Sequence, residues 1–316
     1  MFIRFLCTLL LALGLNFTTA FAQSCNFSIT TIDFGNVNLG VGGAPATTGT
    51  LTASCTGNAN SNITICPNIG DGTGGSNAGS PRFLAQGGNN VGYNLYQPNG
   101  QIWGSFVWPY APRAPILSLT LNAVGTGTLT QNIDAQLTGT VLLAPSGVFQ
   151  SIYNGAHTLL DYGYAPAQSC SVVSARAVRS NFIVRAQNNS SCNISTTSMN
   201  FGSQANLTLA KTASNQISIT CTTGVRYTVG LSYGANGGTS PVNRFMAGPL
   251  PAQKIQYGIY QNASLAQAWG TTIGKDTIAG TATGLTQAYN AYGQIPAQTT
   301  PQGGSYADTV VVTVTY

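Results

Sequence analysis

The sequence predicts an all-β protein built from two antiparallel β-sandwich domains. Three observations predict this fold class. Apolar residues make up 43% of the 316 residues and charged residues only 5%, so the chain can collapse around a core instead of staying disordered. Short stretches rich in β-branched residues alternate with Gly, Asn and Ser turns, without sustained helical periodicity. An internal repeat indicates two copies of one domain.

The scarcity of charge also excludes several classes of function. The chain has 11 basic and 6 acidic residues, no Glu, and a single histidine, His157. Multi-histidine metal sites and acid/base pairs of glutamates are therefore impossible. The net charge of +5 is spread too thinly for a nucleic-acid-binding surface, because no cluster of basic residues could neutralise several phosphates together. We expect neither a nucleic-acid partner nor a cofactor.

The first element along the chain, residues 1–22, has the pattern of a signal peptide. Arg4 precedes an apolar stretch over 5–15, and Ala20-Phe21-Ala22 supplies the small-x-small cleavage pattern. The apolar stretch is too short to cross a bilayer about 30 Å thick as a helix, which takes about 20 residues. We therefore expect a secreted protein whose mature form is soluble or assembled outside the membrane.

The cysteines agree with an oxidising compartment. After cleavage six remain, which is an even set suited to three disulfides: Cys25, Cys55, Cys66, Cys170, Cys192 and Cys221. The chain has no C-x-x-C pair, which argues against a metal or redox role.

The internal repeat divides the remaining chain into 23–187 and 188–316. Both copies open with Ser-Cys-Asn-x-Ser, at Ser24 and at Ser191, and Phe-Gly follows nine residues after the Cys in each. Three more landmarks follow in the same order: Arg82-Phe83 and Arg244-Phe245, Tyr93–Gln97 and Tyr257–Gln261, and Trp103-Gly104 and Trp269-Gly270. Each copy has the size of an ordinary domain.

Candidate strands occupy equivalent places in the copies. Residues 51–55, 216–220 and 227–231 alternate and lie between turn residues. The equivalent cysteines predict the disulfides Cys25–Cys55 and Cys192–Cys221, which leaves Cys66–Cys170 within the first domain. Other connectivities, such as Cys55–Cys66, remain open on the sequence alone.

The two copies end differently. The second ends with the run 306–316, in which Val310, Val312, Val314 and Tyr316 share one face. The first continues past the matching segment, through Cys170, to an extra candidate strand around 181–185. We therefore expect the second sandwich to lack its final strand, which leaves an open groove and an unpaired edge of the kind that proteins normally cover.

These residues carry a resemblance. Both copies resemble the spore coat protein U domain, and the whole chain resembles the two-domain tip subunits of archaic, Csu-type chaperone–usher pili. The shared marks are the Cys-Asn-x-Ser start, the Phe-Gly, the Tyr-x-x-Tyr-Gln, the Trp-Gly and the terminal Tyr-Ala-Asp-Thr-Val-Val-Val-Thr-Val strand. The first copy departs from this pattern at its end, where Gly147–Ser151 replaces the terminal motif.

The resemblance implies that both domains are immunoglobulin-like and that the second is completed by a strand from another chain. The donor would first be a periplasmic chaperone and, after passage through the outer-membrane usher, the N-terminal strand of an adjacent pilin. Val310, Val312, Val314 and Tyr316 would contact it. Only Gln23 and Ser24 would precede Cys25 after cleavage, so we expect a subunit that accepts a strand, donates none and sits at the pilus tip.

The resemblance also suggests adhesion through exposed hydrophobic loops, with biofilm formation as the result. The stretch 102–116 is rich in aromatics and prolines and is poor strand material. We expect Phe106, Val107, Trp108 and Tyr110 to be exposed there, and Leu142 and Leu143 in a second loop, 141–145. Such patches often mark contact sites, here for an abiotic or host surface, although core positions are an open alternative.

Other functions remain as alternatives. A lectin-type tip domain could stack a sugar on Trp108 and Tyr110, and a structural spore-coat or outer-surface role would also suit the domain family. An enzyme is not expected, because His157 stands alone and the glycines of 71–75 have neither the Lys nor the helix of a phosphate-binding loop.

Overall fold

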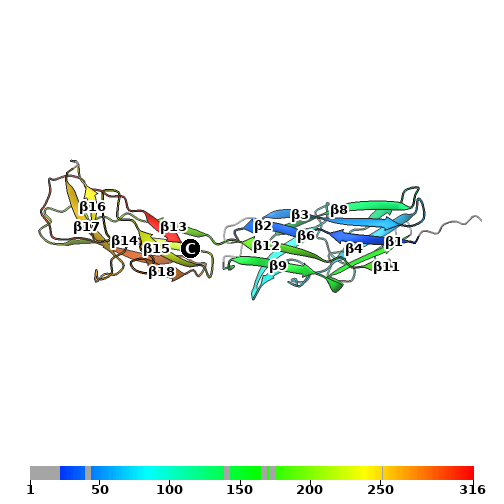
Figure 1. The fold of residues 1–316 in the computed structure, drawn as a ribbon. Coiled ribbons are helices and arrows are strands. Elements are labelled where there is room, and N and C mark those ends of the chain that lie inside the picture. The colour runs from blue at the N-terminus through cyan, green and yellow to red at the C-terminus, as the bar shows by residue number, and fades with distance from the viewer. Residues whose placement is uncertain (1–21, 40–43, 139–142, 165–168, 171–175, 251) are drawn as a thin grey trace, which may run out of the picture.

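The computed structural model describes residues 22–39, 44–138, 143–164, 169–170, 176–250 and 252–316. The predicted signal peptide lies outside the described residues. Within them the chain is almost entirely β, as predicted, and forms two β-sandwich domains (Figure 1). None of the helices found there is long and apolar enough to cross a membrane.

The elements of the first domain are β1 (Ser24–Ile29), β2 (Ile32–Val37), β3 (Ala46–Thr56), β4 (Asn62–Ile69), β5 (Arg82–Gln86), β6 (Asn89–Tyr96), β7 (Leu117–Thr120), β8 (Thr126–Leu137), β9 (Gly147–Tyr153), the 3-10 helix η1 (Gly155–His157), β10 (Thr158–Gly163), β11 (Arg176–Val178) and β12 (Phe182–Asn188). One sheet has the order β1-β3-β8-β6-β5-β9-β12-β2 and the other β11-β10-β4-β7. All pairs are antiparallel except that of β12 with β2, which is parallel.

The second domain repeats this plan with fewer strands. Its elements are β13 (Cys192–Thr196), β14 (Lys211–Cys221), β15 (Arg226–Leu231), β16 (Arg244–Ala247), β17 (Lys254–Tyr260), β18 (Ile278–Thr281), β19 (Gln287–Ile295) and β20 (Val312–Thr315). The sheets have the orders β13-β14-β19-β17-β16 and β18-β15-β20.

A buried arginine and a buried tryptophan join the two sheets in each domain, which explains two of the repeated landmarks. Arg82 and Arg244 are fully buried. The Arg82 guanidinium donates to the carbonyls of Ile69 and Gly70, at the end of β4, and of Trp103. In the same way the Arg244 guanidinium donates to the carbonyls of Leu231 and Ser232, at the end of β15, and of Trp269. Trp103 and Trp269 donate to the carbonyls of Pro67 and Val229, both at 2.9 Å.

Three disulfides are formed: Cys25–Cys55, Cys66–Cys170 and Cys192–Cys221. The first and third occupy equivalent places, because each joins the start of a domain's first strand to a residue at or next to the end of the following long strand. The second lies beside the half-buried Phe106.

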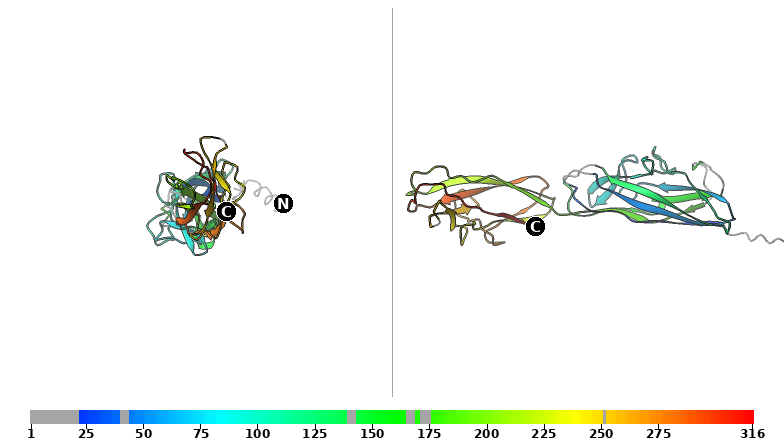
Figure 2. Two further views of the ribbon diagram at one scale, coloured as in Figure 1. Left: turned by 90° about the vertical axis from the view of Figure 1, so that its left-hand side faces the viewer. Right: turned by 90° about the horizontal axis from the view of Figure 1, so that it is seen from above.

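The two domains lie end to end along one axis (Figure 2), and in the end-on view they overlap. The first strand of the first domain begins at the end far from the second domain, whereas β12 ends beside it (Figure 1). The first domain therefore has a distal end and a junction end.

Candidate functional site

The last strand of the first domain fills a slot between two other strands. β12 pairs with β9 on one side, with Phe182 opposite Tyr153 and Asn188 opposite Gly147, and with β2 on the other. Its side chains alternate, so that Phe182, Val184 and Ala186 are buried in the core. The ring of Phe182 stacks on Tyr153 with the centroids 4.3 Å apart. β12 thus supplies three core side chains and closes the sheet.

β11 continues this closure in the other sheet. It pairs with β10, with Val178 opposite Leu160 and Arg176 opposite Tyr162. The segment from Arg176 to Asn188 therefore runs antiparallel first to β10 and then to β9. This is the extra candidate strand expected from the sequence, and it is longer than predicted because β11 belongs to it as well.

The residues that receive this segment have counterparts in the second domain. The register of Ala85 with Gln150 corresponds to the bridge between Ala247 and Ala307, since Arg82 and Arg244 are equivalent. Residues 306–309 therefore correspond to β9. By the same comparison β20 corresponds to β10, because each pairs with the strand that ends at Ile69 or Leu231.

Nothing among the described residues of the second domain takes the place of β11 and β12. The sheet β18-β15-β20 ends at β20, and residues 199–204, which correspond to β2, form no strand. The second domain is thus the incomplete sandwich that the sequence predicts.

A groove lies where the missing strand would be. It consists of two adjoining hollows of about 740 and 480 Å³ that share the lining residues Met199, Phe201, Met246 and Tyr306. One wall is the chain that follows β13, and the other is the chain that leads into β20. Core residues such as Ile217 and Ile259 lie at its floor. Apolar side chains therefore remain reachable from solvent along the line that β12 covers in the first domain.

Asp308 is the single charged residue among those lining the two hollows. Its carboxylate accepts hydrogen bonds from the Tyr257 hydroxyl at 2.6 Å and from the Ala235 amide and the Asn236 side chain at 2.9 Å. Burial and this hydrogen bond raise the pKa of Tyr257 well above its ordinary value. The carboxylate is thus engaged by the protein and holds the turn at 234–236 against the groove wall.

The residues predicted to contact a donor strand are placed differently from one another. Val310, Val312 and Val314 are half-buried and pack against the core, whereas Val311, between them, points outward. Tyr316 is 58% exposed and lines a shallow depression with Arg226 and Ile273. Its counterpart in the first domain, Tyr162, is buried, where its hydroxyl accepts from the Cys25 amide at 3.2 Å and its ring meets Phe27.

The expectation that Trp108 is exposed is wrong. Trp108 is only 8% exposed, because its ring lies 4.9 Å from the buried guanidinium carbon of Arg82 and meets the edge of Tyr110. A cation over an aromatic face is attracted to it. Phe106 and Tyr110 are half-buried, and Val107 is 59% exposed.

The loop that carries Val107 is tightly held. Arg113 donates to the carbonyls of Ser105, Trp108 and Tyr110, and the Asn68 side chain accepts from the Phe106 amide at 2.7 Å. Because Asn68 lies inside β4, this loop lies along the flank of the domain and not at its distal end.

The second predicted loop lies at the junction end. Leu142 is outside the described residues, and Leu143 is 51% exposed. The neighbouring Pro145 forms a bridge with Thr223 of the second domain. The described residues 143–146 therefore lie beside the second domain, at the junction end where β9 begins.

The distal end of the first domain is a surface that no sequence pattern indicated. Two loops there, Gly57–Ser61 and Asn122–Gly125, are joined by backbone hydrogen bonds from Gly57 to Gly125 and from Asn60 to Asn122. Val124, at their tip, is 68% exposed. A single Val among Gly, Ala and Asn gives no pattern by which the sequence could have marked this surface.

The fold and the groove define a class of protein, a pair of β-sandwich domains of which the first is complete and the second has an apolar groove in the place of the last strand. The chain belongs to the Spore Coat Protein U domain family, because the model of that domain matches residues 12–134 and 178–313.

Solved structures of similar fold include pilus proteins. A chain in the crystal structure of the CsuC–CsuE chaperone–tip adhesion subunit pre-assembly complex, from archaic chaperone–usher Csu pili of Acinetobacter baumannii, aligns with a TM-score of 0.53 and 16% identity, over 93% of this chain and 100% of that one. The CupB6 tip adhesin of Pseudomonas aeruginosa aligns with a TM-score of 0.41 and 12% identity, over 93% and 94% of the two chains. The first of these alignments, with a TM-score of 0.53 and 16% identity, supports the fold. No match was found among curated proteins.

Proposed function

We propose that this protein is the tip subunit of a chaperone–usher pilus. Its second domain accepts a strand, first from a periplasmic chaperone and, after passage through the outer-membrane usher, from an adjacent pilin. Its first domain attaches the cell to a surface and so promotes biofilm formation. The segment that begins at Ser24 is already paired within the first domain, because it forms β1 and β1 pairs with β3.

One observation carries the proposal: the same slot is filled by β12 in the first domain and open in the second. Backbone pairing with residues 306–315 would provide a general attachment, and alternating side chains would fill the apolar hollows. The first domain shows what completion achieves, since Val184 and Ala186 of β12 have no exposed surface.

The direction of β12 also suggests how the fibre continues. A donor that copies β11 and β12 would run antiparallel to 304–316, starting opposite Tyr316 and leaving beside Gly304. Tyr316 lies near the junction and residues 300–305 at the far end of the second domain (Figure 1). The body of the donating subunit would then follow on the side away from the first domain, which leaves that domain at the tip.

The test is to supply the strand. A fusion of a short turn and a copy of residues 176–188 after Tyr316 should give a monomer whose second domain unfolds at a clearly higher temperature than in the chain alone. The matched control carries the same copy with Val184 and Ala186 of the inserted strand replaced by Asp. If the chain alone is as stable as the fusion, or the control stabilises equally, the groove is not a strand acceptor.

For surface contact we propose two loops of the first domain with exposed apolar side chains, Val124 at the distal end and Val107 on the flank. Burial of apolar surface yields about 25 cal/mol per Å², and many pili per cell multiply a weak contact. The half-buried Phe106 and Tyr110 add further apolar surface beside Val107 in the flank loop.

This proposal is tested with Val107→Asp and Val124→Asp, and with Leu209→Asp in the second domain as the control, because Leu209 is also highly exposed. Pili carrying either first-domain variant should bind a hydrophobic surface less well, and the control should bind normally. Inhibition by free glycans, without dependence on the surface, would instead favour the lectin alternative. Unchanged binding by both variants would contradict the choice of loops.

A further inference from the structure

The connection between the domains is short and begins from a fixed point. β12 ends at Asn188 and β13 begins at Cys192, so three residues join them. The Asn188 side chain is 2% exposed. It donates to the carbonyls of Ala144 and Pro145 and accepts from the Leu39 amide at 3.1 Å. The end of β12 is therefore anchored in the first domain.

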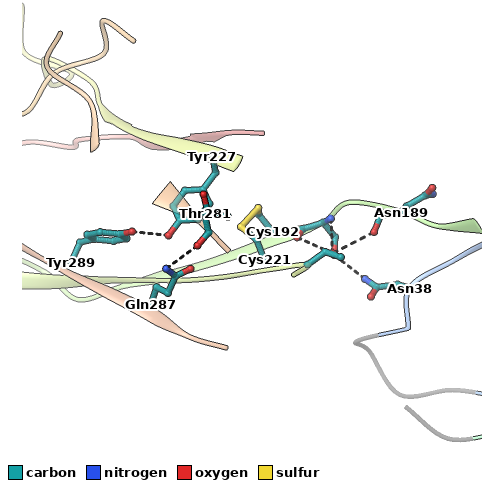
Figure 3. The surroundings of a disulfide bond; sticks show 10 residues. Asn38, Asn189, Cys192, Cys221, Tyr227, Thr281, Gln287 and Tyr289 are labelled. Carbon is teal, nitrogen blue, oxygen red and sulfur yellow. Dashed lines mark hydrogen bonds between the residues drawn. A yellow bond between two sulfur atoms is a disulfide. The ribbon is translucent and has the colours of Figure 1, made fainter. Parts of the chain in front are cut away.

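The connecting residues are bonded to both domains. Thr222 accepts from the Ser191 amide at 3.1 Å and donates to the Asn189 carbonyl at 3.3 Å, and Asn38 of the first domain donates to the Ser191 hydroxyl at 3.1 Å. Figure 3 shows these contacts next to the Cys192–Cys221 disulfide. The connecting residues 189–191 can extend only a little, so tension applied to the first domain is transmitted almost directly to Cys192.

The disulfide stands at the point where such a pull enters the second domain. Cys192 is the first residue of β13, and Cys221 is the last residue of β14. β13 is an edge strand that pairs only with β14, over the five positions from Cys192 to Thr196. β14 is an interior strand and pairs with β19 over nine positions. The sulfur bridge thus connects the incoming chain to the better-held strand.

The end of β13 and the chain that follows it form one wall of the groove. Thr196 is the last residue of β13, and Met199 and Phe201 follow it; all three line the groove. If β13 were pulled away from β14, this wall would be pulled away with it, and a bound donor strand would lose the residues on that side.

From these observations we propose that the Cys192–Cys221 disulfide transmits tension from the first domain directly to β14. It thereby prevents β13 from separating from β14 and from the acceptor groove. This inference rests on the proposed function, because only a tip subunit held by a donor strand is pulled between its two domains.

The chain contains a matched control. Cys25–Cys55 joins β1 to β3, the counterparts of β13 and β14 in the first domain. Its two cysteines are 30 residues apart in sequence, and those of Cys192–Cys221 are 29 apart. It lies near the distal end of that domain, at the start of β1, and the connection between the domains leaves from β12. Tension between the distal loops and the second domain therefore bypasses it.

The experiment is single-molecule stretching of the full chain completed by the fused donor strand. One handle is a peptide tag inserted between Ala123 and Val124, and the other is a tag after the donor strand. Three proteins are compared: the parent, Cys192→Ala with Cys221→Ala, and Cys25→Ala with Cys55→Ala.

In the first double variant the force that opens the second domain should fall to roughly half, since five paired positions resist in place of nine. The extension on unfolding should grow by about 100 Å, because 29 more residues extend by up to about 3.5 Å each. The second double variant should open the second domain at the force of the parent.

Equal opening forces in the parent and in the first variant would overturn the proposal, and so would an equal loss in both variants. To guard against a folding defect, the stretching is repeated on the folded Cys25→Ala, Cys55→Ala protein before and after reduction, with the extension step showing which molecules have lost Cys192–Cys221. Failure of the donor strand to complete the second domain at all would appear before stretching, as a failure of the proposed function.

Discussion

Phe182→Ala removes the largest side chain that β12 contributes to the first domain, and it therefore measures how much a completing strand stabilises this fold. The ring is 4% exposed and stacks on Tyr153. Truncation of a buried Phe costs about 3–5 kcal/mol, and loss of the aromatic pair contributes about 0.5–1.5 kcal/mol of that cost. We expect a loss of about 4 kcal/mol in the free energy of unfolding of the first domain.

Guanidinium denaturation followed by tryptophan fluorescence measures this change, because Trp103 and Trp108 are both buried in the first domain. With an m-value of about 4 kcal/mol/M, the midpoint should fall by about 1 M. Ile183→Ala is the control, since Ile183 is the neighbouring residue on the outer, half-exposed face. If the two variants have the same midpoint, β12 does not complete the core in the way described.

Three further predictions concern single side chains. Arg244→Met leaves the buried carbonyls of Leu231 and Trp269 and the part-buried carbonyl of Ser232 without this donor. At about 1–3 kcal/mol for each buried unsatisfied group, the free energy of unfolding of the second domain should fall by at least about 2 kcal/mol; an unchanged melting temperature would contradict this. Asp308→Ala frees the Tyr257 hydroxyl and the turn at 234–236, so a donor peptide copied from residues 176–188 should bind at least about tenfold more weakly by calorimetry, a factor that corresponds to about 1.4 kcal/mol, and equal affinity would refute this role. Burial raises the pKa of the Asp161 carboxyl, so the folded first domain binds the proton more tightly than the unfolded chain does, and its stability should fall as the pH rises from about 3.8 through the raised pKa; Asp161→Asn should remove this slope in denaturation midpoints measured between pH 3 and pH 7, and an unaltered slope would assign it to another group.

Much of the architecture follows from the repeat. Equivalent positions in two copies occupy equivalent places, so the repeat marks Arg82 and Arg244, and Trp103 and Trp269, as counterparts. The burial of all four side chains is shown by the structure. The extra strand of the first copy follows from the same comparison, because the first copy continues past the matching segment through 181–185. The break between β11 and β12 was not predictable, since it depends on the two sheets that the segment joins.

The functional loops were less predictable. Trp108 and Val107 are neighbours in one aromatic, proline-rich stretch, yet the first is buried over Arg82 and the second is exposed. Local composition indicates a loop but does not indicate which of its side chains turn inward. Leu143 and Val124 show the same limit, because the direction of the strands decides which loops meet the second domain and which reach the distal end.

The sequence by itself determined the β class, the two copies, the cysteine pairs that the copies share and the extra strand of the first copy, because these depend on composition, periodicity and self-similarity along the chain. Only the tertiary structure decided that the slot of β12 becomes an apolar groove in the second domain, that Asp308 is engaged within it, and that Cys192–Cys221 stands where the domains join. Those features arise between segments far apart in sequence, and the contacts that create them exist only once the sheets have formed.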